Sequence, residues 1–169
     1  MRSSFVGALV LTATLLFTGC NTIVSGPAAP ASSYTQANES VKKFIEQYNL
    51  EVVDYTYVRS KLGNGMRSGA KAIFVDARPD KRYQTSTIPS SIQIHDTEFK
   101  EHVVRLESTP KDAEIIVFCQ GWDCAKSPKT ARMLQEMGYN NVKLYQAGIP
   151  DWQSKDYIEI GTLIIKSAF

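Results

Sequence analysis

Four short apolar runs constrain the fold of this chain more than any other feature. They are rich in β-branched residues, and helical patterns separate the last three of them, as is typical of parallel sheets covered by helices. The four runs are AIFVDA (72–77), SIQI (91–94), EIIVF (114–118) and NVKLY (141–145). The sequence therefore predicts an α/β fold, a single domain with a mostly parallel central sheet flanked by helices.

The rest of the chain adds predicted helices and one more predicted strand. Apolar residues at positions 41, 44, 45 and 48 have the spacing of an amphipathic helix. Phe99, Val103 and Leu106 mark a second helix, and residues 128–137 a third. EVVDYTYV (51–58) has the composition of a strand, and SKLGNGMRSGAK (60–71) is typical of a glycine-punctuated loop.

Residues 1–19 have the layout of a secretory signal, because Arg2 precedes a short apolar run. Thr18 and Gly19 before Cys20 resemble the lipobox of bacterial lipoproteins, whose cysteine is lipidated after cleavage. The alternative is an ordinary cleavage site with an incidental cysteine. Asn21 differs from the Asp that favours inner-membrane retention. We predict a lipid-anchored protein of the bacterial cell envelope that faces the periplasm, with the outer membrane favoured over the inner.

Composition bounds the remainder of the chain. Residues 20–36 are rich in Ala, Ser, Pro and Gly, which predicts a flexible tether between the lipidated cysteine and a folded domain at 37–169. Hydrophobic residues make up 43% of the chain and charged residues 21%, which is ordinary for a globular domain. The formal charge is only +2, so we expect no nucleic-acid partner.

The stretch EIIVFCQGWDCAKSPKTARMLQEMGY (114–139) carries the candidate chemistry. Cys119 stands at the carboxyl end of a predicted strand, where open parallel sheets bind their ligands. Ser127 is the predicted N-cap of the next helix, Pro128 its first residue, and Gly138 its end. Loop amides, the positive end of that helix and Lys126 would together favour a thiolate at Cys119.

These residues are also compatible with other interpretations. Cys119 could be only a small buried hydrophobic residue. A phosphatase of related fold would place His before the cysteine and Arg six residues after it, where this chain has Phe118 and Ala125. The glycines at 63, 65 and 69 superficially match a nucleotide-binding loop, but no strand-turn-helix context follows them. A metal site built from both loop cysteines with His95 and His102 lacks ligand spacing, so no metal is predicted.

The chain resembles the rhodanese family of sulfurtransferases over residues 55–157. Three separated signatures carry the resemblance, in the order in which that family has them. They are VDARPDKRYQTSTIPSSIQI with Asp76, Arg78, Tyr83, Ile88 and Pro89; the helix pattern of Ser127, Ala131 and Leu134; and GIPDW with Gly148 and Trp152.

The resemblance implies sulfur transfer without an organic cofactor. In that family the loop cysteine takes a sulfane sulfur from a small donor, holds it as a persulfide, and passes it to a thiol or cyanide-like acceptor. Here the nucleophile would be Cys119, while Asp76 and Arg78 would support the loop or the strand ends. The substrate-binding cradle would comprise Gln120, Gly121, Trp122, Asp123, Cys124, Ala125, Lys126 and Ser127.

The chain departs from the family pattern in ways that leave alternatives open. Ser127 lies eight residues after Cys119 rather than six, and Thr87 replaces the usual histidine. Cys124 adds a second loop cysteine, as in a subgroup of exported rhodanese-like proteins. Cys119 and Cys124 could therefore form a thiol-disulfide redox switch, or Cys124 could be a structural staple or an inert thiol. A non-catalytic module that binds an unidentified protein partner is the remaining alternative.

Overall fold

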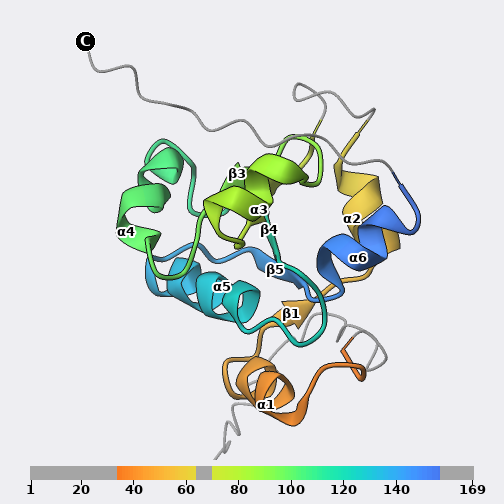
Figure 1. Ribbon diagram of the computed structural model, residues 1–169. Helices are drawn as coiled ribbons and strands as arrows, with labels where there is room; N and C mark the ends of the chain where they lie inside the picture. The colour runs from red at the N-terminus through yellow and green to blue at the C-terminus, as the bar shows by residue number, and fades with distance from the viewer. Residues whose placement is uncertain (1–33, 64–69, 157–169) are drawn as a thin grey trace, which may run out of the picture.

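A computed structural model describes residues 34–63 and 70–156, so the predicted signal and most of the predicted tether lie outside the described residues. Five parallel strands form one sheet in the order β1-β5-β4-β2-β3 (Figure 1). The strands are β1 (Glu51–Val52), β2 (Ile73–Asp76), β3 (Ile92–Gln93), β4 (Ile115–Phe118) and β5 (Val142–Tyr145). The predicted α/β class and parallel sheet are confirmed.

The central strand β4 is fully buried, as its apolar run requires. It pairs with β2 on one side and β5 on the other, and Phe118 lies level with Asp76 and Tyr145. Three strands therefore end together at one edge of the sheet. In the described part of the chain, no helix is long and apolar enough to cross a membrane.

Helices cover both faces of the sheet and make a three-layer domain (Figure 1). On one face of the sheet, a core cluster packs strand side chains against α1, α5 and the segment formed by α4 and η3. On the other face, a second cluster packs strand side chains against α2 and α6. The short helix α3 follows β2. The helices are α1 (Glu39–Gln47), α2 (Tyr55–Lys61), α3 (Asp80–Thr85), α4 (Phe99–His102), the 3-10 helix η3 (Val103–Leu106), α5 (Lys126–Glu136) and α6 (Gly148–Gln153).

The predicted strand at 51–58 is wrong beyond its first two residues. Asp54 ends the extended segment, because its carboxylate accepts a hydrogen bond from the Tyr57 N–H at 2.8 Å and caps α2. The helix continues to Lys61, inside the segment predicted as a loop. Gly63 follows with φ +68°, while Gly65 and Gly69, the other glycines of the superficial match to a nucleotide-binding loop, lie outside the described residues.

Candidate functional site

Cys119 lies directly after β4, at the edge where β2 and β5 also end. Its carbonyl accepts a hydrogen bond from the Ile149 N–H at 2.9 Å, which ties it to the first turn of α6. The residue is only 1% exposed. The sequence prediction of Cys119 at the carboxyl end of a buried parallel strand therefore agrees with its place in the structure.

A disulfide joins Cys119 to Cys124, with the two Cα atoms 6.3 Å apart. This separation lies within the usual range for disulfides of about 4.4 to 6.8 Å. The loop between the cysteines curls back on itself, and the Cys124 N–H donates to the Gly121 carbonyl at 2.9 Å. The structure thus brings together the two cysteines that the sequence identified as a possible redox pair, and shows their oxidised form.

Gln146, which was not predicted as a site residue, supports the loop between the two cysteines through hydrogen bonds. It is fully buried directly after β5. Its side-chain Nε2 donates to the carbonyls of Trp122 at 2.7 Å and Cys124 at 3.0 Å, with a longer contact to Gly121 at 3.4 Å. Its Oε1 accepts from the Ser127 hydroxyl at 3.3 Å. One buried amide therefore connects both halves of the loop to the central sheet.

The predicted capping role of Ser127 is wrong. Helix α5 begins one residue earlier, at Lys126, and its N-cap is Ala125, which makes no side-chain capping bond. Ser127 is fully buried in the first turn, and its hydroxyl donates to the Gln146 side chain instead of capping the helix backbone. The predicted end of the helix at Gly138 agrees with its φ of +89°.

Gly148 places the loop against α6. Its φ is +61°, and a Cβ atom at this position would lie 2.2 Å from the Cys119 carbonyl oxygen and 2.9 Å from the Gly121 nitrogen. A side chain therefore cannot be accommodated without a backbone shift at the cysteine. The GIPDW signature thus contributes a close approach between two backbones at the site.

Asp76 and Arg78 form a buried ion pair beside the loop. The Arg78 Nη2 atom lies 2.7 Å from the Asp76 carboxylate, and its Nη1 donates to the Gln120 side chain at 3.4 Å. Arg78 also donates to the Ser86 carbonyl. Thr87, which replaces the usual histidine of the family, donates its hydroxyl to Asp76 at 2.9 Å. These contacts join the end of β2 to the residue that follows Cys119.

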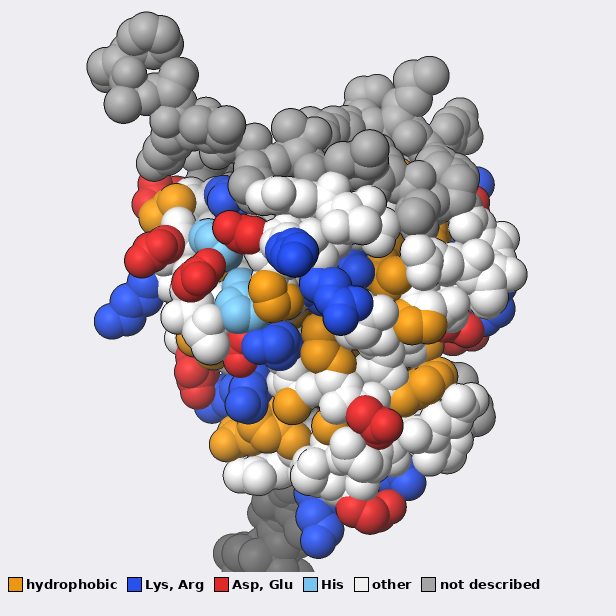
Figure 2. All heavy atoms as spheres, in the orientation of Figure 1, with side chains coloured by type: hydrophobic (Ala, Val, Ile, Leu, Met, Phe, Trp, Pro, Cys, Tyr) orange, Lys and Arg blue, Asp and Glu red, His pale blue; other side chains and the backbone are white. Residues whose placement is uncertain are grey.

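A basic cavity of about 630 Å³ opens beside Gln120. Its charged lining residues, among those the structure describes, are all cations, and α3 supplies two of them, Lys81 and Arg82, both exposed. Figure 2 shows Lys and Arg side chains gathered near the middle of the face that it presents. The full lining is Arg78, Lys81, Arg82, Thr85, Ser86, Gln120, Ile149 and Gln153.

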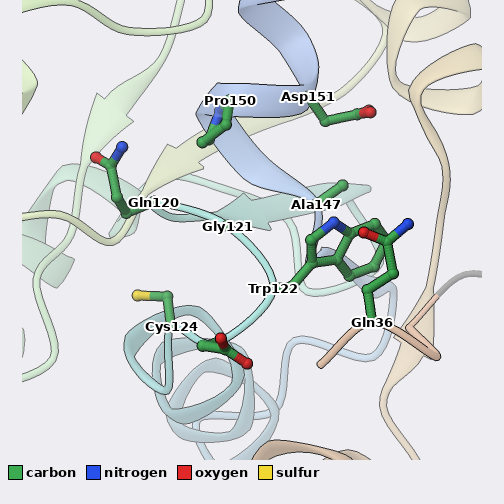
Figure 3. Close-up of a pocket in the computed structure, with 9 residues that line it drawn as sticks. Gln36, Gln120, Gly121, Trp122, Cys124, Ala147, Pro150 and Asp151 are labelled. Carbon is green, nitrogen blue, oxygen red and sulfur yellow. The ribbon is translucent and has the colours of Figure 1, made fainter. Parts of the chain in front are cut away.

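A second cavity, of about 570 Å³, lies along the other side of the loop (Figure 3). In this view Gln120 and Cys124 lie toward one end of the cavity, and Trp122 and Gln36 lie toward the other (Figure 3). Asp123, Asp151, Gly121, Ala147 and Pro150 complete the lining.

Two carboxylates of this second cavity accept hydrogen bonds from neutral donors, and one of them also forms an ion pair. The Asp123 carboxylate accepts from the backbone N–H of Asn38 at 2.8 Å, so the segment before α1 is tied to the loop. The Asp151 carboxylate accepts from the Tyr145 hydroxyl at 2.6 Å, and it also pairs with Lys155 on its outer side. Burial raises the pKa of the Tyr145 phenol, so this hydroxyl stays protonated and donates.

Lys126, the cation predicted to favour a thiolate, is paired elsewhere. Its ammonium lies 3.2 Å from the Asp96 carboxylate. The positive charge of Lys126 is therefore balanced by Asp96. The cation that contacts the loop at Gln120 is Arg78.

Both histidines are buried and lie next to each other, although they are separated in the sequence. The His95 backbone N–H donates to His102 Nδ1 at 3.2 Å, and His102 Nε2 faces the Glu98 carboxylate at 3.5 Å. Asp80, Glu98 and His102 form a group whose potential metal-ligand atoms all lie within 4.8 Å of one another. Because Nδ1 accepts a hydrogen bond, the neutral ring carries its proton on Nε2, which suits donation to a carboxylate rather than metal ligation.

A protein family and several solved structures resemble this chain in sequence or in fold. A family model described as the rhodanese-like domain matches residues 58–155, which is more than half of the chain. The human single-domain sulfurtransferase TSTD1 has a similar structure, with 20% sequence identity and a TM-score of 0.51 over 63% of this chain and 97% of that one. The BH2092 protein from Bacillus halodurans is 25% identical, with a TM-score of 0.53 over 75% of this chain and 87% of that one.

A third solved structure is a larger protein. The thiosulfate sulfurtransferase from Pseudomonas aeruginosa is 21% identical, with a TM-score of 0.56, and the match covers 73% of this chain but only 22% of that one. The family match and the shared fold coincide with the strand, loop and helix that carry Cys119. The chain belongs to the rhodanese-like family.

Proposed function

We propose that the reduced protein is a sulfurtransferase that carries a sulfane sulfur on Cys119 as a persulfide and passes it to a thiophilic acceptor. The position of Cys119 directly after β4, at the start of a loop that Gln146 supports, carries this proposal. The cysteine needs no cofactor for this chemistry, because the thiolate itself is the nucleophile. Small donors such as thiosulfate or a polysulfide are the substrates that such a site can serve.

The geometry of the loop supports an anionic sulfur at this position. Gln146 draws three carbonyls of the loop toward itself. Because the C=O and N–H groups of a peptide point in opposite directions, the N–H groups that follow Gly121, Trp122 and Cys124 are directed away from Gln146. With the N-terminus of the eleven-residue helix α5, they can stabilise a persulfide anion.

The basic cavity supplies a docking place for an anionic donor. Arg78, Lys81 and Arg82 line it together with Gln120, the residue that follows the nucleophile. An anionic donor held there would have its charge balanced before sulfur is transferred. This arrangement supports thiosulfate-like donors over uncharged ones.

Mass spectrometry of the intact, reduced protein tests the proposal. After incubation with thiosulfate and removal of excess donor, we expect the Cys124→Ser variant to gain one sulfur atom, located on Cys119, because it has no Cys124 thiol to displace that sulfur. A Cys119→Ser variant should gain none. Sulfur on Cys124 alone, or sulfite release by the Cys119→Ser variant, would contradict the proposal.

The disulfide supports a second function, in which Cys124 controls or completes the reaction. In the persulfide form, the Cys124 thiol can attack the inner sulfur of Cys119, forming the disulfide and releasing hydrogen sulfide. No external oxidant is needed, because the sulfane sulfur takes the two electrons that the two cysteines lose. The oxidised site then awaits a thiol reductant before it can accept sulfur again.

We also propose that Cys20 anchors the protein in the cell envelope, on the basis of the signal-like residues before it. The native protein is expected to partition into the detergent phase, and a Cys20→Ser variant into the aqueous phase or as an unprocessed precursor. Mass spectrometry of the mature N-terminus provides the measurement. Cleavage at another bond without acylation would contradict the anchor.

A further inference from the structure

We propose that the cavity on the Cys124 side of the loop is where a small thiol reductant binds and opens the disulfide, by attack on Cys124. The inference deepens the redox part of the proposed function and depends on the disulfide, not on sulfur transfer. Three observations carry it: the unequal exposure of the two cysteines, the lining of the cavity, and its charge.

The two sulfur-bearing residues differ in access. Cys119 is 1% exposed and is not among the lining residues of the cavity, whereas Cys124 is half-buried and lines it. A nucleophile that enters the cavity therefore meets Cys124 first. Cys119 is the better leaving group, because the loop amides and the N-terminus of α5 can stabilise its thiolate.

The charge of the cavity selects the thiol. Asp123 and Asp151 line it, and no Lys, Arg or His side chain does so within the described ranges 34–63 and 70–156. Asp151 is paired with Lys155, which does not line the cavity, so the charge preference is assigned to Asp123. Asp123 directly precedes Cys124 in the chain, and both residues line this cavity. The site therefore favours thiols that carry an amine or no charge, and disfavours carboxylate-bearing thiols. The basic cavity beyond Gln120 has the opposite preference.

Reduction of the Cys119–Cys124 disulfide takes two steps. A thiolate attacks the Cys124 sulfur, a mixed disulfide forms there, and the Cys119–Cys124 bond breaks with release of the Cys119 thiolate. A second thiol attacks the mixed disulfide, leaves as the small-molecule disulfide, and frees the Cys124 thiol. The protein disulfide gains two electrons, and two small thiols lose one each.

The attacked sulfur can be identified in the full-length Cys20→Ser protein, which has only the two loop cysteines. The oxidised protein is mixed briefly with cysteamine, quenched with an excess of N-ethylmaleimide, and mapped by fragmentation of the 112–126 peptide. We expect the cysteamine adduct on Cys124 and the maleimide on Cys119. The reverse distribution, or an equal mixture, would overturn the proposal.

The charge preference is tested by rates of disulfide opening, which do not require trapping of the mixed disulfide. Cysteamine, 2-mercaptoethanol and 3-mercaptopropionate are compared, with each rate expressed per thiolate and divided by that thiol's rate with hydroxyethyl disulfide. We expect cysteamine to be about five-fold faster than 2-mercaptoethanol, the factor expected for one opposite charge about 4 Å away in water. 3-Mercaptopropionate should be the slowest.

Asp123→Asn is the matched variant, because its amide oxygen can still accept from the Asn38 N–H. It should remove most of the cysteamine advantage, whereas Asp112→Asn, at an exposed site before β4, should keep it. An unchanged thiol order in Asp123→Asn would overturn the assignment of this cavity. Because no sulfur donor is present, the result stands apart from any failure of persulfide formation.

Discussion

Oxidised wild-type protein is expected to take up no sulfur from thiosulfate, and reduction is expected to restore uptake by a factor of about 100 or more. The disulfide leaves Cys119 without a thiolate, and the thiolate is the species that attacks the donor. Sulfur uptake is measured by the sulfite released from thiosulfate after the reductant has been removed, with Cys20→Ser as the background so that only the loop cysteines contribute.

Cys124→Ala separates this redox control from other effects of a reductant. The variant cannot close the disulfide, so its sulfur uptake should be nearly the same with and without prior reduction. Free thiols are titrated in both proteins before the assay. Equal dependence on reductant in the Cys20→Ser protein with and without Cys124→Ala, with two free thiols in the untreated Cys20→Ser protein, would rule out the coupling.

Gly148→Ala is expected to lower the free energy of unfolding by about 3 kcal/mol or more, which corresponds to a fall in melting temperature of about 10 °C or more. Its positive φ disfavours any L side chain, and the new Cβ would stand 2.2 Å from the Cys119 carbonyl oxygen. Urea denaturation under oxidising conditions measures the change.

Gly138→Ala provides a matched control for the conformational part of this effect. Gly138 also has a positive φ, +89°, but a Cβ there would meet nothing within 4 Å. It should lower the free energy of unfolding by only about 1 to 2 kcal/mol. Equal losses in the two variants would show that the backbone at Cys119 relaxes without penalty and that the close approach of Gly148 is unimportant.

The strands of the sheet were predictable where a run of consecutive residues is fully buried. Runs such as EIIVF are strands because every residue of β4 is inside, and such runs leave little choice of structure. The helices α2, α3 and α6 were not predicted, because segments of six or seven residues make less than two turns and show no clear helical period. In α2, one capping residue, Asp54, decided against the strand that composition favoured.

The site was predictable only in its local part. Cys119, its loop and the following helix are contiguous in the sequence, so their order indicated a site. Gln146 gave no comparable signal, since its hydrogen-bond partners lie 19 to 25 residues earlier. The one available indication was a polar residue directly after a buried strand. The predicted cap at Ser127 failed for the same reason: a distant amide uses its hydroxyl.

The loop is supported by residues that come later in the chain, and this affects when the loop acquires its shape during folding. Gln146 and Ile149 follow β5, so their bonds to the loop form only after β5 has paired with β4, and such non-local contacts are slow to form. The disulfide spans only five positions, so its ring can close in a chain that has no sheet. Oxidation can thus precede folding. A newly made chain with the bond already closed must still complete its sheet before the loop acquires the shape seen here.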